Sequence, residues 1–256
     1  MTNIGVIMIF DVTPYHIFQT KKDKLIKLLL DVDTGIDDAL ALFYLAHAQK
    51  KGEIEILGST TVGGNVEVSQ TTLNTLKIWE MLELDIPVAS GAKQPLMVPL
   101  NPAPYVHGDD GLGNTFLPPP KKLPAKESAA EMILRLSHEY AGELTLLTTA
   151  PLTNIAVALL QDPSLAKRIC KVVIMGGAVF TGNVSAVAEA NIANDPEAAR
   201  IVFRSGMDMT LIGLDVTHEV YWEEQDLQEL VKINNERSAF LLQIIGFIST
   251  AYENLS

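Results

Sequence analysis

The stretch from Leu28 to Leu45, LLLDVDTGIDDALALFYL, constrains the fold of this chain more than any other. An apolar run stops at four aspartates, Asp31, Asp33, Asp37 and Asp38, and an apolar run of helical character follows. This pattern predicts a buried strand, an acidic turn and a helix.

Carboxylates crowded at the end of a buried strand repel one another and lose hydration, so they are tolerated mainly where a cation neutralises them. A site for a hard divalent cation such as Ca²⁺, which takes oxygen ligands, is therefore the first hypothesis. The alternative is a solvated turn whose aspartates cap the helix.

Two other motifs share these letters. The D-x-D-x-G spacing imitates the start of an EF-hand loop, but that loop needs a bidentate Glu at its twelfth position, where this chain has Leu42. An apolar strand followed by D-x-D also resembles the nucleophile motif of haloacid dehalogenase-type phosphohydrolases, with Asp31 as the nucleophile. Those enzymes usually carry Thr or Val at the position of Gly35. The phosphohydrolase interpretation stays as an alternative.

Strand and helix patterns alternate along the chain. We expect strands at residues 28–30, 54–61, 86–89, 144–148, 171–175 and 209–214, and helices at 38–49, 68–82, 128–140, 151–162, 223–232 and from about 235 to the end. The alternation predicts an α/β fold with a doubly wound, mostly parallel sheet and helices on both faces. Polar groups that follow such strands meet along one edge of the sheet. We expect one crevice to collect Asp33, Asp38, Asn65, Thr149, Met175 and Asn191.

Two segments depart from this alternation. Residues 91–122 are rich in proline and glycine, so we expect a long loop, and ordered loops of this length are usually functional. In its middle, His107 is either a donor to a substrate or a surface histidine. Residues 1–24 lack the features of a secretory signal and are expected to be an extension of uncertain structure. Residues 25–256 are expected to form a single domain.

The composition narrows the choice of partners. A net charge of −12 argues against nucleic acid or an anionic membrane surface and favours a small neutral substrate or a cation. No apolar run approaches the roughly 18 residues that a membrane span requires. The one cysteine, Cys170, rules out an intramolecular disulfide and a thiolate zinc cluster. We expect Cys170 to be a buried structural thiol and the compartment to be a reducing cytoplasm.

Six motifs together resemble the inosine-uridine preferring nucleoside hydrolase family. In family order over roughly residues 27–250, they are D-V-D-T-G-I-D-D (31–38), T-T-V-G-G-N (60–65), V-H-G-D-D-G-L-G (106–113), L-T-N (152–154), M-G-G (175–177), and the run from Gly182 through E-A-N (189–191) to D-P-E-A-A (195–199). The resemblance implies a nucleoside hydrolase-like fold and hydrolysis of the N-glycosidic bond of ribonucleosides to ribose and free base.

The resemblance also implies roles for individual residues. A Ca²⁺ ion would be held by Asp33, Asp38 and the backbone carbonyl of Thr149, and it would grip the ribose 2′- and 3′-hydroxyls and a water whose proton Asp33 takes. The candidate catalytic residues are Asp33, Asn191 and His107, the last of them near the leaving base. Asp37 and Asn191 would hold ribose hydroxyls, and Asn65 would help to hold either Asp33 or the sugar. Asn183 and Glu189 would bind the 5′-hydroxyl. Met175 would pack against the sugar.

Two departures from the family pattern affect these expectations. Ala190 stands where family members usually carry an aromatic residue. The family pattern also continues to a His-Asp pair that completes the metal site, and no His-Asp dipeptide occurs in these 256 residues. We therefore expect a C-terminally incomplete domain, with a catalytically impaired remnant as the alternative function. Because family members are commonly dimers or tetramers, a homo-oligomer is expected.

Overall fold

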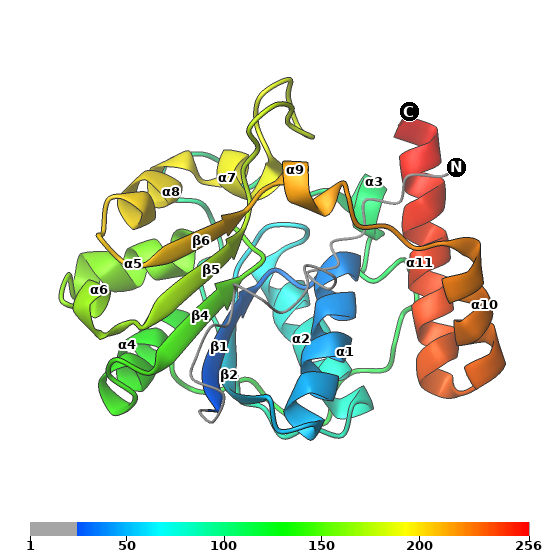
Figure 1. Ribbon diagram of the computed structural model, residues 1–256, viewed down its shortest axis with the longest axis horizontal. Helices are drawn as coiled ribbons and strands as arrows, with labels where there is room; N and C mark the ends of the chain where they lie inside the picture. Colours follow the sequence, from blue (N-terminus) through cyan, green and yellow to red (C-terminus); the bar gives the residue numbers. More distant parts are fainter. Residues whose placement is uncertain (1–24, 256) are drawn as a thin grey trace.

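A computed structural model describes residues 25–255, which contain one parallel six-stranded sheet (Figure 1). The strands are β1 (Ile26–Val32), β2 (Ile54–Thr61), β3 (Val88–Ser90), β4 (Leu144–Thr148), β5 (Lys171–Met175) and β6 (Met209–Ile212). Their order is β3-β2-β1-β4-β5-β6, and every neighbouring pair is parallel. The predicted fold class is confirmed. The predicted N-terminal extension lies outside the described residues.

Helices cover both faces of the sheet (Figure 1). The side chains of β1 alternate between two apolar cores, because successive residues of a strand point to opposite faces: Leu28 and Leu30 belong to one core and Leu29 to the other. The first core is closed by α1 (Ile36–Lys50), α2 (Val68–Met81) and α11 (Glu236–Leu255), the last of which also packs against α10 (Glu224–Ile233). The second core is closed by α4 (Ala129–Glu139), α5 (Thr153–Gln161), α6 (Leu165–Arg168) and α8 (Pro196–Phe203).

The direction of winding reverses at β1. The chain builds β2 and β3 on one side of this strand and then β4, β5 and β6 on the other. Asp31 is in register with Thr60 of β2 and with Thr148 of β4, so the residues that follow these three strands lie level with one another. In open parallel sheets, ligands bind outside the carboxyl ends of the strands at such a reversal. The topology therefore places the acidic turn at the position most suited to a ligand.

The ends of several elements differ from the sequence prediction. β1 continues to Val32, so Asp31 lies inside the strand, and α1 begins at Ile36, which puts Asp37 and Asp38 in its first turn. The short helices α3 (Pro104–His107), α7 (Ala190–Asn194) and α9 (Leu214–Thr217), together with α6, were not predicted. Helices of four or five residues carry too little periodicity to be recognised in a sequence.

The expectation for Cys170 is wrong, because this residue is exposed. It precedes β5 at the amino-terminal edge of the sheet, and burial of the strand begins only at Val172. Among the helices of residues 25–255, none is long and apolar enough to cross a bilayer.

Candidate functional site

Two buried carboxyl groups meet where β1 gives way to α1. Asp33 follows the strand, Asp38 lies in the first turn of the helix, and each is 1% exposed. Asp38 Oδ2 accepts a hydrogen bond from Gly35 N at 3.0 Å, and its carboxyl group lies against that of Asp33. Burial raises the pKa of both groups well above the ordinary value, and neighbouring carboxylates add to the effect. Among residues 25–255, Asp33 Oδ1 is buried and has no hydrogen-bond partner. A bound proton or cation would therefore stabilise this pair of carboxyl groups.

The T-T-V-G-G-N motif supplies the support on the β2 side. Asn65 N donates to Asp33 Oδ2 at 2.7 Å, and Asn65 Nδ2 lies 3.4 Å from both the Asp33 carbonyl and Asp38 Oδ2. A Cβ atom at Gly64 would stand 2.0 Å from Asp33 Oδ2. Only glycine allows the backbone to approach the carboxylate this closely. The structure thus places Asn65 against Asp33, one of the two positions expected for it.

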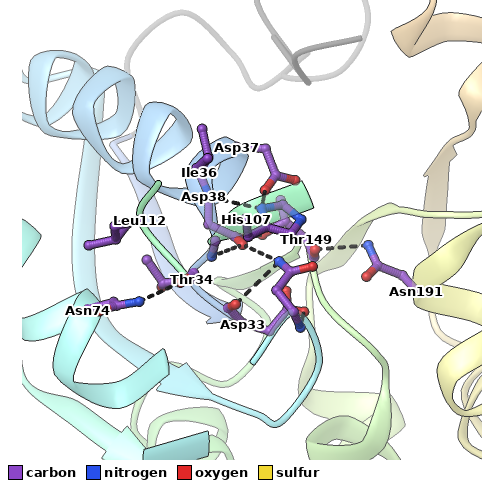
Figure 2. A network of polar contacts seen from close by, with 12 residues as sticks. Asp33, Thr34, Ile36, Asp37, Asp38, Asn74, His107, Leu112, Thr149 and Asn191 are labelled. Atoms are coloured by element: carbon purple, nitrogen blue, oxygen red, sulfur yellow. Dashed lines mark hydrogen bonds and ion pairs between the residues drawn. The ribbon is translucent and has the colours of Figure 1, made fainter. Parts of the chain in front are cut away.

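Thr149 and Asn191 approach from the β4 and β5 side. Thr149 Oγ1 donates to Asp38 Oδ1, and Asn191 Nδ2 donates to the carbonyls of Thr149, at 2.9 Å, and Met175, at 3.2 Å. Figure 2 shows Asn191 reaching toward Thr149 while Asp33, Asp38 and His107 gather at the start of α1. The Thr149 carbonyl keeps a second lone pair after the Asn191 bond. Its predicted use as a cation ligand is therefore compatible with this contact.

His107 lies at the amino-terminal end of α1. Its Nδ1 accepts a hydrogen bond from Ile36 N at 3.2 Å, so the proton of the neutral ring is on Nε2. Burial lowers the pKa of His107, and Asp37, whose Oδ1 is 3.8 Å from Nδ1, opposes that shift. Asp37 Oδ1 is buried and accepts no hydrogen bond from the described part of the chain. His107 is 7% exposed, so it is not the surface histidine of the alternative interpretation.

Glu189 and Asn183 order the segment before α8. Glu189 caps α7, with Oε1 accepting from Asn191 N at 2.8 Å and Oε2 accepting from Gly177 N and Ile192 N at 2.9 and 3.1 Å. Burial raises the pKa of Glu189, and these backbone donors oppose the effect. Asn183 is exposed, and its Oδ1 accepts from Ala190 N at 2.9 Å. The Asn183 Nδ2 group is the part of this pair that is most open to a ligand.

These groups surround one cavity of about 350 Å³. Eight of the predicted site residues line it: Asp37, Asn65, His107, Thr149, Met175, Asn183, Glu189 and Asn191. Asp33 and Asp38 lie directly behind Asn65 and Thr149, to which they are hydrogen-bonded. The structure therefore brings together every site residue that the sequence suggested.

The sequence did not suggest the rest of the cavity lining. Besides Ala190, the position already noted as a departure from the family pattern, this lining consists of Leu214, Thr217, His218, Ile248 and Tyr252. Tyr252 and Ile248 belong to α11, far along the chain from the motifs, and burial raises the pKa of Tyr252 to about 12. Their spacing of four residues, one helical turn, was the one available signal, and it is equally typical of a core face.

A larger cavity of about 600 Å³ lies elsewhere, between α2, α11 and the loop around Leu117. Its charged groups have mixed signs, and two of them, Arg237 and Glu83, are paired at 3.0 Å. None of the predicted site residues lines it. We therefore assign the chemistry to the smaller cavity.

Asp31 has a different environment from the other aspartates of the turn. It is 2% exposed, and its Oδ1 accepts from Asn154 Nδ2 and Thr60 Oγ1, each at 2.7 Å. It is not among the residues that line the cavity. A phosphoryl nucleophile must reach its substrate, so this geometry does not favour the phosphohydrolase alternative.

The donor set suits a hard cation. Within the described part of the chain, no group of three or more His, Cys, Asp or Glu side chains could hold a metal ion. The candidate ligands are instead two carboxylates, Asp33 and Asp38, and one backbone oxygen, that of Thr149. All three are oxygens, which Ca²⁺ and Mg²⁺ prefer. The unpartnered Asp33 Oδ1 fits such an ion.

Comparison with known proteins finds one matching family and several similar sequences. Residues 28–256 match the family described as inosine-uridine preferring nucleoside hydrolase. The chain is 43% identical over 225 residues to Uridine nucleosidase 1 of Arabidopsis thaliana, an alignment that covers 86% of this chain and 66% of that protein. It is 40% identical over 231 residues to the Inosine-uridine preferring nucleoside hydrolase of Leishmania major, covering 89% and 72%. The chain thus spans about two thirds of the length of these curated relatives.

Solved structures give the same result. The plant nucleoside hydrolase PpNRh1 superposes with a TM-score of 0.85 at 37% identity, over 90% of this chain and 73% of that one. The Purine-Preferring Ribonucleoside Hydrolase from Gardnerella vaginalis also superposes with a TM-score of 0.85, at 36% identity over 90% and 74%.

Proposed function

The chain belongs to the inosine-uridine preferring nucleoside hydrolase family, and on that premise we propose that its cavity hydrolyses the N-glycosidic bond of a ribonucleoside. The products are ribose and the free base. We propose Ca²⁺ as the cation at Asp33, Asp38 and the carbonyl of Thr149.

The observation that carries the proposal is the pair of buried carboxyl groups behind the cavity. Asp33 and Asp38 lie against each other at 1% exposure, and Asp33 Oδ1 has no hydrogen-bond partner in the described structure. A fold that keeps two such carboxyl groups together is stabilised by a bound cation. When bound, the ion supplies a ligand position for the ribose hydroxyls and for water, and it lowers the pKa of that water.

The protein groups around the cavity would orient the sugar. Asp37 Oδ1, which is buried and unpartnered, can accept from a ribose hydroxyl, and the free Oδ1 of Asn191 can do the same. Asn183 and Glu189 also line the cavity, and we assign the 5′-hydroxyl to them. Met175 offers an apolar wall at the end of β5.

The reaction replaces the bond between C1′ and the base nitrogen with a bond to water oxygen. The base departs from an oxocarbenium-like ribosyl group, as in glycoside hydrolysis, and nearby carboxylates and amides stabilise its positive charge. The Asp33 carboxylate accepts the proton that the attacking water loses. His107 donates a hydrogen bond from Nε2 to the leaving base, since its Nδ1 is occupied by Ile36 N. The proton held by Asp33 then returns through water to the departed base nitrogen, so one nucleoside and one water give one ribose and one neutral free base.

Ribose release from inosine and from uridine, with and without Ca²⁺, tests the proposal. Both substrates are needed because the relatives include a uridine nucleosidase and a purine-preferring hydrolase. We expect Ca²⁺-dependent release that Asp33→Asn abolishes, with Ca²⁺ binding followed by calorimetry. Tight Ca²⁺ binding without ribose release from either nucleoside would favour the impaired remnant instead. Unchanged release after Asp33→Asn would refute the assigned site.

A further inference from the structure

One polar side chain connects the two parts of the site without touching the cavity. Asn74 of α2 is completely buried, at 0% exposure, and it does not line the cavity. Its Nδ2 donates to the carbonyl of Thr34 at 3.1 Å and to the carbonyl of Asp110 at 2.8 Å. Figure 2 shows the Asn74 amide pointing at Thr34 from the side opposite to Asn191.

The two carbonyls belong to the segments that carry the proposed chemistry. Thr34 directly follows Asp33 in the acidic turn, and Asp110 lies three residues after His107. Residues 110–116 form a stiff loop, because the Asp110 carboxylate accepts from the backbone N–H groups of Leu112, Asn114 and Phe116, each at 2.8 Å. Gly113 N in turn donates to the carbonyl of His107 at 2.8 Å, so holding the Asp110 carbonyl also holds residues 107–116, here called the His107 loop.

The Asn74 amide is itself fixed in orientation. Gln70, one turn earlier on α2, donates from Nε2 to Asn74 Oδ1 at 2.8 Å, which turns both Nδ2 protons toward the two carbonyls. Gly111 packs directly against the amide, since a Cβ atom there would stand 2.9 Å from Asn74 Nδ2. The surrounding groups therefore fit an amide side chain at position 74.

We propose that Asn74 is a positioning residue that fastens the His107 loop to the acidic turn and so sets the place of His107 relative to Asp33 and Asp38. The proposal rests on the proposed function of the same cavity. A further tie between the two segments, from Ile36 N to His107 Nδ1 at 3.2 Å, ends on the histidine itself. Without Asn74, this contact and the Asp37 carboxylate, 3.8 Å from Nδ1, would be left to orient the ring.

The test compares Asn74→Ala with a matched control. Ser59→Ala is the control because Ser59 is also 0% exposed and also bonds a side chain of α2, Trp79 Nε1 at 3.0 Å, without contacting the site. Both substitutions remove one buried hydrogen-bonding side chain. Asn74→Ser, which retains a single donor, replaces Asn74→Ala if the alanine variant does not fold.

Three readouts are expected to move in the Asn74 variant and not in the control. The affinity for Ca²⁺ falls about 10- to 100-fold by calorimetry, the usual cost of losing a residue that supports metal ligands. At saturating Ca²⁺, kcat falls while KM changes less, because the Asn191 and Glu189 side of the cavity is untouched. In the metal-free protein, nitrogen-15 NMR of His107 shifts away from an unprotonated, hydrogen-bonded Nδ1.

Wild-type values for all three readouts in a folded Asn74 variant would overturn the proposal. Equal losses in Asn74→Ala and Ser59→Ala would also overturn it, since they would reflect general destabilisation. If the wild-type protein releases no ribose, the proposed function fails, but Ca²⁺ affinity and the His107 spectrum still decide the role of Asn74.

Discussion

Replacing Asp31 with asparagine removes a carboxyl group that the fold buries completely while leaving its shape unchanged. Burial raises the pKa of Asp31 from its ordinary 3.8 to about 6, although Asn154 and Thr60 donate to Oδ1 and lower it. The other oxygen, Oδ2, is buried and has no hydrogen-bond partner among the residues that the structure describes. The folded protein therefore favours the neutral carboxyl group, which asparagine imitates.

The size of the effect follows from linkage. Because the folded-state pKa is the higher one, the contribution of Asp31 to stability is complete below about pH 4 and is lost as the pH rises through about 6. At about 1.4 kcal/mol for each pH unit, the full loss is about 3 kcal/mol. About half of it, roughly 1.5 kcal/mol, falls between pH 5 and pH 8. The asparagine variant has no such loss.

Urea unfolding of both proteins in a chelator, at pH 5 and at pH 8, measures this difference. We expect Asp31→Asn to gain about 1.5 kcal/mol relative to the wild type over that interval. The change with pH is the test, because a constant offset can arise from the new amide. A difference that does not vary with pH would refute the reasoning. Ribose release should largely survive in Asp31→Asn, whereas a phosphohydrolase with Asp31 as nucleophile would lose its activity.

Three further results are expected. Ca²⁺ affinity should increase with pH, because the raised pKa values of Asp33 and Asp38 mean that protons must leave before the ion binds; calorimetry in two buffers would show the proton release, and a pH-independent affinity would contradict it. Gly64→Ala should abolish Ca²⁺ binding while the circular dichroism spectrum persists, since its Cβ would stand 2.0 Å from Asp33 Oδ2; retained binding would show that the turn can move. His107→Ala leaves Ile36 N without its side-chain acceptor and should lower the free energy of unfolding by about 1–3 kcal/mol, measured with urea, and an unchanged value would mean that water replaces the ring.

The sequence alone predicted the sheet and the convergence of the site. The apolar runs of β1, β2, β4 and β5 are local patterns that end where the polar motifs begin, and parallel strands bring their carboxyl ends to one edge. The fold class and the gathering of Asp33, Asn65, Thr149 and Asn191 could therefore be predicted without a structure.

The tertiary structure alone decided which polar groups face the cavity and which support it from behind. Asp31 and Asp33 are two residues apart with the same side chain, yet one is enclosed by Asn154 and Thr60 and the other adjoins Asp38. Asn74 and Tyr252 each lie on a helix where sequence cannot distinguish a core position from a site position. The physical reason is that the hydrogen-bond partners, burial and pKa of a side chain depend on contacts between segments far apart in the chain. The hydrophobic periodicity of a segment shows only which of its own faces is buried.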